Sequence, residues 1–404
     1  MRPWFLLASL ILSGSALAAA DEALLGKAEG YPVCDVWKLS SEPRCLVGTL
    51  SHFDAKLPTR LVEKAHSPWL LKHAASEPTV LYDYRGKEGR TTDAFLADGR
   101  NTGLLVVQGD TILVERYQYG RKPTDRFQSY SMAKTVIGML VGIALAEGKL
   151  SSIDDLASKY VPELKGQPYG ETRLRDLLTM SSGVKFSEEY DGKDDVTELA
   201  VRTLFQHGPG GAASVAGFTE RAAPAGTRFS YASSESEVLG LVLRAAIGRP
   251  LSDYLSEKIW RPMGAEADAT WIVDAGGTEL GYMGLNATLR DWGRFGMLLA
   301  NDGARDDRQI IPAAWVKAAT TPSAPHLQVG VATKFNGYGY QTWIIRKDRR
   351  DFAALGLRGQ AIMVDPDSKV VVVHTAVHDT AADNPLRGEQ FAYFFGVLNS
   401  LKQH

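Results

Sequence analysis

A serine and a lysine three positions apart, Ser131 and Lys134, have the types and the spacing that nucleophilic catalysis can use. A hydroxyl is a poor nucleophile until a neighbouring base takes its proton. The pair opens the most apolar helical run after the N-terminus, which extends from Ser131 to Glu147. Residues three apart on a helix share one face. The spacing therefore predicts a nucleophile and its base on one rigid element.

The pattern alone is weak evidence, because a chain this long should contain about one Ser-x-x-Lys by chance. A second copy, from Ser182 to Lys185, serves as an internal control. Its Gly183 follows a helical pattern over Thr172 to Met180, and glycine commonly ends a helix. Lys185 is therefore expected beyond the helix, where the one-turn geometry is lost. Ser131 is the better candidate nucleophile.

A tyrosine a hundred residues further on, Tyr231, stands between a turn at 224–227 and a helical pattern that begins at Ser234. Such a position can project a phenol into a cleft while the backbone stays fixed. The functional interpretation is a partner in proton transfer. The alternative is a half-buried aromatic side chain that only packs.

Gly359 and Gln360 stand immediately before a strand pattern that begins at Ala361. Glycine at a strand entrance lets another backbone approach closely. This position could leave a strand N–H free to bind a developing oxyanion. An ordinary tight turn is the alternative interpretation.

Together these features resemble the serine beta-lactamase and penicillin-binding-protein superfamily, in particular its class C-like branch with esterases and 6-aminohexanoate-dimer hydrolase. The resemblance covers roughly residues 96 to 400, and flanking segments carry it as well: 174–183, 224–231 and 337–341. It implies that Ser131 is the acylated nucleophile, with Lys134 as its base or proton relay. It also implies that Tyr231 shares proton transfer. The backbone N–H groups of Ser131 and Gln360 would form the oxyanion hole.

The chain departs from the family pattern at two places. Ser233 stands where an asparagine is usual, and Leu357 to Gly359 stand where lactamases carry Lys-Thr-Gly. Arg358 cannot replace that lysine, because successive strand side chains point to opposite faces. Losing the cation removes a partner for a substrate carboxylate, so efficient beta-lactam hydrolysis is disfavoured. The acidic segment 186–190 resembles the loop that carries a substrate-side tyrosine in aminohexanoate hydrolases.

The expected substrate-binding residues are therefore Tyr190, Ser233 and Gly359. The sequence offers no sign of a metal or a cofactor: Gly-x-Ser-x-Gly, His-Glu-x-x-His and phosphate-binding loop patterns are all missing. His374 and His378 stand four apart at a strand end, and we interpret them as structural. A net charge of −2 without long runs of one sign argues against nucleic-acid or anionic-membrane partners.

The order of strand and helix patterns predicts an α+β fold. Strand patterns lie at 104–107, 111–114, 340–345, 361–364 and 370–377, and helical patterns at 131–147, 153–160, 172–180, 234–246, 251–259, 287–300, 312–320 and 391–401. Strands at both ends with helices between them indicate one antiparallel sheet from about 100–120 and 335–404. Helices flank it, and a mostly helical region, about 131–300, is inserted. This hydrolase domain is expected over 96–404.

The first ninety-five residues are expected to comprise two further parts. Residues 1–20 read as a secretory signal peptide, with Arg2, an apolar core from Trp4 to Leu12 and small residues at 18–20. The core is too short to span a bilayer, and no later stretch reaches spanning length. Residues 21–95 are rich in proline and without a clear period, which predicts an irregular extension wrapped on the main body.

The only cysteines, Cys34 and Cys45, lie in this extension. In an exported protein they are expected to form a disulfide. A redox or metal pair is the alternative, but it lacks a Cys-x-x-Cys spacing and nearby histidines. The expected location is therefore the periplasm or the medium, without a stable membrane anchor.

These observations predict an exported serine hydrolase that cleaves small amides or esters through an acyl-enzyme on Ser131. A lysine that acts as a base at neutral pH needs a pKa about three pH units below its usual value, which burial can supply. Activity on cell-wall peptides, as in a DD-peptidase, or weak beta-lactamase activity are alternatives. So is a catalytically silent peptidoglycan- or peptide-binding protein. The natural substrate and the oligomeric state stay open.

Overall fold

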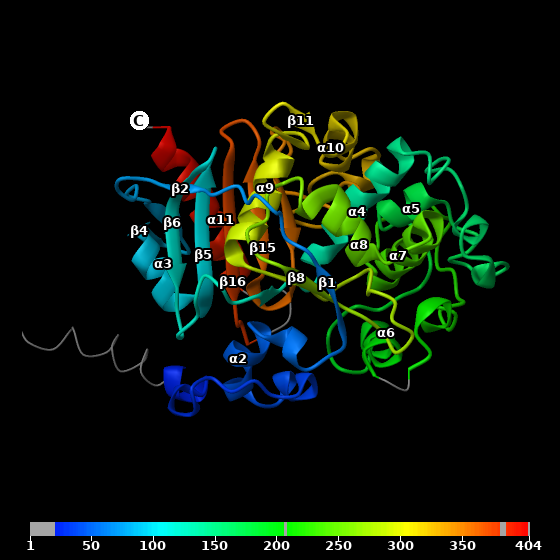
Figure 1. The fold of residues 1–404 in the computed structure, drawn as a ribbon, viewed down its shortest axis with the longest axis horizontal. Coiled ribbons are helices and arrows are strands. Elements are labelled where there is room, and N and C mark those ends of the chain that lie inside the picture. The colour runs from blue at the N-terminus through cyan, green and yellow to red at the C-terminus, as the bar shows by residue number, and fades with distance from the viewer. Residues whose placement is uncertain (1–20, 206–207, 380–384, 403–404) are drawn as a thin grey trace, which may run out of the picture.

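An eight-stranded sheet forms the left half of the molecule in Figure 1. The computed structural model describes residues 21–205, 208–379 and 385–402, so the expected signal peptide lies outside the described residues. The strands, in their order across the sheet, are β12 (Gly337–Tyr338), β13 (Trp343–Ile344), β14 (Phe352–Leu355), β15 (Ala361–Asp365), β16 (Val370–Ala376), β5 (Asn101–Gln108), β6 (Thr111–Tyr117) and β2 (Lys72–His73). All neighbours pair antiparallel except β2 and β6.

The centre of this sheet joins the two ends of the chain, because β16 pairs with β5. Valine runs favour these strands, since branched side chains pack well on a pleated surface. The side chains alternate between two cores: Val371 and Val373 belong to the core that includes α9 (Leu289–Ala300), and Val370 and Val372 to the core that includes α11 (Pro385–Leu401). Two layers of helix therefore sandwich the sheet, as Figure 1 shows.

The inserted region between the two parts of the sheet is mostly helical. It contains α4 (Met132–Ala146), α5 (Leu174–Leu178), α6 (Asp195–Leu204), α7 (Ser233–Ile247) and α8 (Leu251–Leu255), and α10 (Ala313–Ala319) lies against α4. A small sheet with the strand order β1 (Thr59–Val62), β8 (Ala269–Ile272), β9 (Leu285–Ala287) and β7 (Phe127–Gln128) adjoins it. Among the described helices, none is both long enough and apolar enough to cross a membrane.

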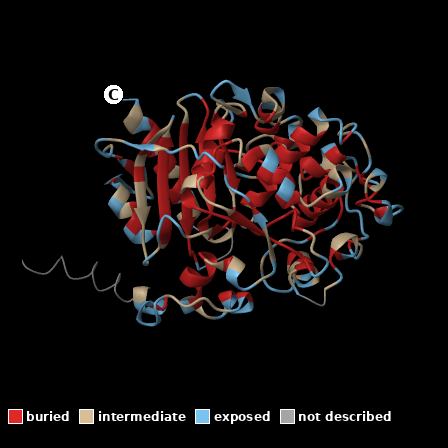
Figure 2. Ribbon diagram, in the orientation of Figure 1, coloured by how far each residue is buried: buried red, intermediate tan, exposed pale blue. Residues whose placement is uncertain are grey.

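Helix α4 is the centre of this helical region and is buried on every side from Met132 to Ala144 (Figure 2). A helix that is apolar all round belongs in a core rather than at a surface. Its glycines allow close packing: a Cβ on Gly138 would lie 3.0 Å from the carbonyl of Tyr340, and one on Gly142 would overlap the ring of Trp315. Helix α4 is therefore a rigid base for any group at its start.

The expected α+β class and the sheet built from both chain ends are confirmed. The 104–114 hairpin and the helices from Ser131 and Ser234 are confirmed as well. The helix expected over 153–160 is wrong: only Ala157–Lys159 forms a 3₁₀ turn. Local side-chain bonds compete there, since the Asp155 carboxylate accepts from the Ser152 N–H at 3.0 Å and the Tyr160 hydroxyl at 2.7 Å.

Three other boundaries also differ from the sequence patterns. Of the strand expected over 340–345, only Trp343–Ile344 forms a strand (β13); a turn with Gln341 at φ 53° separates it from β12, which lies earlier at Gly337–Tyr338. Strand β14 was not predicted, because Phe352–Leu355 is short and half alanine. The helix over 251–259 is α8 followed by a π-helical turn, Ser256–Trp260.

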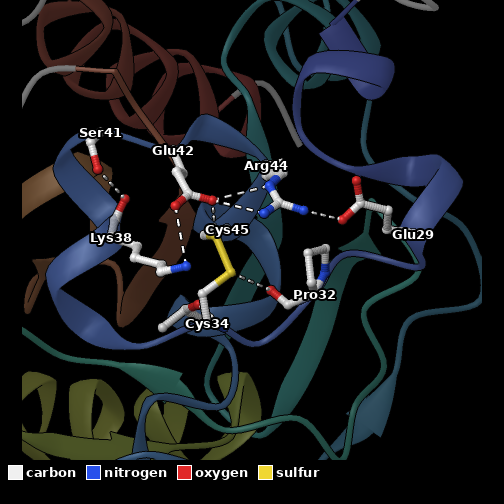
Figure 3. The surroundings of a disulfide bond; sticks show 9 residues. Glu29, Pro32, Cys34, Lys38, Ser41, Glu42, Arg44 and Cys45 are labelled. Carbon is white, nitrogen blue, oxygen red and sulfur yellow. Dashed lines mark hydrogen bonds and ion pairs between the residues drawn. A yellow bond between two sulfur atoms is a disulfide. The ribbon is translucent and has the colours of Figure 1, made fainter.

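The N-terminal segment from residue 21 runs along the lower edge of the molecule in Figure 1, mostly as short turns with α2 (Leu46–Leu50). A disulfide joins Cys34 to Cys45 (Figure 3). Close to it, Arg44 forms ion pairs with Glu42 at 2.9 Å and Glu29 at 2.5 Å. The segment continues into β1, β2, the β3–β4 hairpin (Tyr82–Tyr84 and Lys87–Arg90) and α3 (Thr92–Asp98). A domain boundary at residue 95 stays a prediction.

Candidate active site

Ser131 and Lys134 meet at the start of α4. Ser131 precedes the first turn, and Lys134 lies one turn into the helix, where its Nζ donates to the Ser131 Oγ at 2.7 Å. The same Nζ donates to the Ser233 Oγ at 3.0 Å and to the Tyr282 carbonyl at 3.2 Å. Burial lowers the pKa of Lys134 to about 8, although the nearby Glu188 carboxylate acts to raise it. The ammonium is thus held among neutral acceptors and readily loses a proton.

Tyr231 lies beside this pair. It stands two residues before α7, and its ring centroid is 5.0 Å from the Lys134 Nζ. Burial raises the pKa of the Tyr231 phenol, and the charge of Glu188 adds to the rise, while a side-chain hydrogen bond with Ser131 acts in the opposite direction. The ring stacks on Trp343 of β13 at 5.2 Å. Tyr231 belongs to the helical region, and its contact with Trp343 of the large sheet holds its ring in place.

Glu188 connects three groups of the site, and no sequence pattern singled it out. Its carboxylate accepts from the Tyr190 hydroxyl at 2.6 Å, from the Ser233 hydroxyl at 2.8 Å and from the Ser233 N–H at 2.6 Å. Ser233 in turn accepts from Lys134. The acidic composition of 186–190 was the only sequence signal, and it did not distinguish Glu188 from Glu189, which is exposed.

A cavity of about 450 Å³ opens in front of Ser131. Ser131, Ser233, Glu188 and Tyr190 supply polar groups of its wall. The rest is largely apolar and includes Val36, Trp37, Leu39, Phe53, Val196, Ala200, Leu204, Met283 and Leu357. Trp37 stacks on Phe205 with ring centroids 3.9 Å apart. One wall of the cavity thus comes from the segment bounded by the disulfide.

Gln360, the expected second oxyanion donor, does not line this cavity. Its backbone N–H donates to the Leu357 carbonyl at 3.3 Å, and its side chain donates to the Ala376 carbonyl at 2.7 Å. The sequence interpretation assumed an extended strand entrance. Instead, a 3₁₀ turn over Leu357–Gly359 contains positive φ values at Arg358 (54°) and Gly359 (96°). This turn directs the Gln360 N–H back toward the chain itself, so that assignment is corrected.

Gly359 is also away from the cavity. A Cβ at this position would lie 2.6 Å from the His378 ring, so only glycine fits against that side chain. Its carbonyl accepts a hydrogen bond from the Gln390 side chain at 2.9 Å and lies 2.7 Å from the His374 Nδ1. Gly359 therefore packs the turn against β16 and α11, and the two histidines belong to that packing.

Leu357 takes the place expected for Gln360 and lines the cavity together with Ser131. As the first residue of the turn, its N–H has no carbonyl partner within the turn. Gly356 packs against the backbone just before Ser131, where a Cβ would lie 2.3 Å from the Ser129 carbonyl. Within the described ranges, neither the Ser131 N–H nor the Leu357 N–H donates to a protein acceptor. Two backbone donors are thus available at the cavity.

The family model that matches this chain, described as Beta-lactamase, covers residues 90–389. The chain belongs to the beta-lactamase family of serine hydrolases. It is 26% identical over 360 residues to the 6-aminohexanoate-dimer hydrolase of Paenarthrobacter ureafaciens, covering 86% of this chain and 88% of that protein. A Beta-lactamase of Pseudomonas fluorescens is 27% identical over 141 residues, covering 34% of this chain and 35% of that protein.

Solved structures agree on the fold. A Bacillus anthracis protein, provisionally described as a 6-aminohexanoate-dimer hydrolase, superposes with a TM-score of 0.80 at 24% identity, covering 91% of this chain and 96% of that chain. A penicillin binding protein from Bacillus halodurans gives a TM-score of 0.58 at 16% identity, covering 74% of this chain and 99% of that chain. The expected class C-like resemblance to this family is therefore confirmed.

Proposed function

We propose that the protein hydrolyses small amides or esters through an acyl-enzyme on Ser131. The 2.7 Å hydrogen bond between the Lys134 Nζ and the Ser131 Oγ carries this proposal. A buried lysine with a pKa of about 8 is partly neutral at physiological pH and can accept the serine proton. The start of α4 also favours negative charge at Ser131, because helix N-termini carry a partial positive charge.

In the proposed acylation step, Lys134 accepts the Ser131 proton as the Oγ attacks the substrate carbonyl. The N–H groups of Ser131 and Leu357 bind the oxyanion that develops. The tetrahedral intermediate then expels the amine or alcohol, which receives a proton from Tyr231, and Tyr231 recovers one from Lys134. A water molecule hydrolyses the ester on Ser131 by the reverse sequence, releases the acid and restores the free hydroxyl.

The cavity supports a substrate with an aliphatic acyl chain, since most of its wall is apolar. The relative from P. ureafaciens is named for the 6-aminohexanoate dimer, a linear substrate of the kind that such a wall fits. We propose the same class of small, linear amide or ester substrates here. Export of the protein through its N-terminal segment is also proposed, and the Cys34–Cys45 disulfide supports it.

Substrates with a carboxylate directly beside the scissile bond are disfavoured, whereas the carboxylate of the 6-aminohexanoate dimer is five methylene groups away from it. Arg358 lines the cavity, but its guanidinium donates to the carbonyls of Leu39, His378 and Asp379. Glu188 adds negative charge at the Ser131 end. Hydrolysis of D-alanyl-D-alanine peptides or beta-lactams is therefore expected to be weak. A silent binding protein would have no need of the Lys134 hydrogen bonds.

The test compares the mature protein with Ser131→Ala on aryl esters of increasing acyl length, the 6-aminohexanoate dimer, a D-alanyl-D-alanine peptide and a chromogenic cephalosporin. We expect turnover of the esters and the dimer, and none by the variant. Intact-protein mass spectrometry with a fluorophosphonate should give one adduct, which peptide mapping places on Ser131. The matched control is Ser182→Ala, which should still be labelled. Undiminished turnover by Ser131→Ala would exclude the nucleophile assignment.

A further inference from the structure

Arg387, in the first turn of α11, holds both ends of the turn that carries Leu357. Its guanidinium donates to the Gly356 carbonyl and to the Gln360 carbonyl, the latter at 3.1 Å. It also donates to the Gln390 Oε1 at 3.0 Å. Arg387 lines a separate cavity of about 690 Å³ and not the one in front of Ser131. The guanidinium therefore binds the turn from the side away from the cavity of Ser131.

Within the part of the chain that the structure describes, this arginine donates to carbonyl and amide oxygens. Burial lowers its pKa to about 10, so it stays protonated at neutral pH. The pKa of Tyr231 responds to its charge, so the guanidinium lies within electrostatic range of the reacting groups. Among the described residues, the acceptors of this partly buried guanidinium are all neutral oxygens, and two of them lie at the two ends of one turn. This arrangement suggests that the arginine holds the turn.

The geometry of one peptide unit shows why holding the turn matters for the site. The Gly356 carbonyl and the Leu357 N–H belong to the same planar trans peptide, so they point in opposite directions. A donor that fixes the carbonyl on one side fixes the N–H on the other. On that other side Leu357 lines the cavity of Ser131. A cation on the carbonyl also polarises the peptide and makes its N–H a stronger donor.

The turn needs such support, because its conformation is an uncommon one. Arg358 has a φ of 54°, a region that residues with a side chain seldom adopt. The Gln390 side chain holds the third carbonyl of the turn, that of Gly359, at 2.9 Å. Side chains from α11 thus bind the carbonyl at the entrance of the turn, the carbonyl of its glycine and the carbonyl at its exit.

We propose that Arg387 is the positioning residue of the oxyanion hole: it holds the Gly356–Leu357 peptide so that the Leu357 N–H points at the substrate oxyanion on Ser131. This inference rests on the proposed acyl-enzyme function and names the residue that prepares one of its two donors. Arg387 touches neither substrate nor reacting atoms. It acts only through the peptide plane and its polarisation.

The experiment compares Arg387→Met and Arg387→Lys with the wild type on an aryl ester and on the matching thionoester. Sulfur accepts hydrogen bonds weakly, so the thionoester gains little from the oxyanion donors. For Arg387→Met we expect kcat on the ester to fall by about tenfold to a hundredfold, with KM changed by about threefold or less. Turnover of the thionoester should fall much less. The ratio of kcat/KM on the ester to kcat/KM on the thionoester should therefore be much lower in Arg387→Met than in the wild type.

Arg387→Lys keeps the charge but offers one nitrogen where the guanidinium uses two, so an intermediate ratio is expected. Guanidinium ion added at millimolar concentration to Arg387→Ala should restore part of the ester rate. Arg85→Met is the matched control, because Arg85 lines the same cavity, stacks on Tyr84 and contacts no carbonyl of the turn. It should behave as the wild type.

An equal loss on both substrates, or an unchanged ratio in Arg387→Met, would overturn the inference. If Arg387→Met does not fold, as judged by its thermal melt, the ratio in Arg387→Lys decides. Failure of the proposed function is distinguishable, because Ser131→Ala would then keep its activity whatever Arg387 does. An inactive Ser131→Ala together with a normal Arg387→Met would leave the hydrolase intact and remove only the positioning role.

Discussion

The two Ser-x-x-Lys segments of this chain have the same spacing and opposite environments. At the start of α4, the Lys134 Nζ donates to the Ser131 Oγ, and Lys134 is buried. In the second copy, Ser182 donates to the Glu235 carboxylate at 2.6 Å, whereas Lys185 is exposed and pairs with Glu220 at 2.8 Å. The spacing alone did not bring serine and lysine together in the second copy.

The backbone immediately after each serine makes the difference. After Ser131 the chain continues as α4, so a residue three positions on returns to the same face. After Ser182 comes Gly183 at φ 73°, which turns the chain away beyond the end of α5. The environments then drive the two lysine pKa values apart: burial lowers that of Lys134 to about 8, and the hydrogen bond to Glu220 raises that of Lys185.

The largest expected difference is between the two serines in catalysis. Ser131→Ala should reduce kcat on an aryl ester by at least about a thousandfold, since the acyl-enzyme cannot form. Ser182→Ala should keep kcat within about threefold, because its hydroxyl faces Glu235 and not the cavity. Steady-state kinetics on both purified variants makes the comparison. Similar losses of kcat in Ser131→Ala and Ser182→Ala would contradict the difference between the two serines.

The lysines should differ almost as much. Replacing Lys134 by methionine removes the base and should lower kcat/KM by about a hundred- to ten-thousandfold. Lys185→Met removes only an exposed ion pair and should leave kcat/KM unchanged. Phosphonate labelling rates measure the acylation step directly. Equal labelling of Lys134→Met and wild type would show that another group accepts the proton.

The pH dependence should follow the buried lysine. The active form is neutral Lys134, so the rate of acylation should rise as pH increases from about 6, reach half its maximum near pH 8 and level off above about 9. The same rise is expected in Lys185→Met, whose altered side chain is remote from the site. Labelling rates across this range provide the measurement. A rate that falls with rising pH contradicts a neutral lysine base.

The smallest expected effect is on the free energy of unfolding. Here Ser182→Ala should have a larger effect than Ser131→Ala, the reverse of their order in catalysis. Ser182→Ala takes a hydrogen bond from the buried Glu235 carboxyl and should lower the free energy of unfolding by about 1 to 3 kcal/mol. Ser131→Ala should change it by about 1 kcal/mol or less, because Lys134 keeps its bonds to Ser233 and Tyr282. Urea unfolding of both variants measures these values. A larger loss in Ser131→Ala would give Ser131 a structural role.

The candidate catalytic residues that the sequence singled out, and that the structure brings together, lie on or just before helices. Ser131 and Lys134 share a helix whose apolar pattern is unmistakable, and Tyr231 precedes another. Glu188 escaped detection because its carboxylate reaches Ser233, which lies 45 residues further along the chain. Such a contact depends on how two loops are placed, and no local periodicity records it.

The loop that contains Leu357 and Gln360 also shows that a local sequence pattern does not fix how a loop is oriented. The glycines before β15 indicated a special backbone but not its direction. Two residues with positive φ shifted the available N–H from Gln360 to Leu357, three positions earlier. A positive φ at Arg358 is locally unfavourable, so the contacts of α11 with the turn stabilise this conformation over an extended one.

Local sequence patterns were sufficient for the α+β class, for the sheet assembled from both chain ends and for the helix that carries Ser131 and Lys134. Strand and helix periodicity encode these features, and burial of the apolar faces then leaves few ways to assemble them. Tertiary contacts determined the other features: the burial of Lys134, the hydrogen bond between Glu188 and Ser233, and the orientation of the Leu357 N–H. Desolvation, a lowered lysine pKa and an oriented peptide all arise from groups distant in the chain, and packing alone brings those groups together.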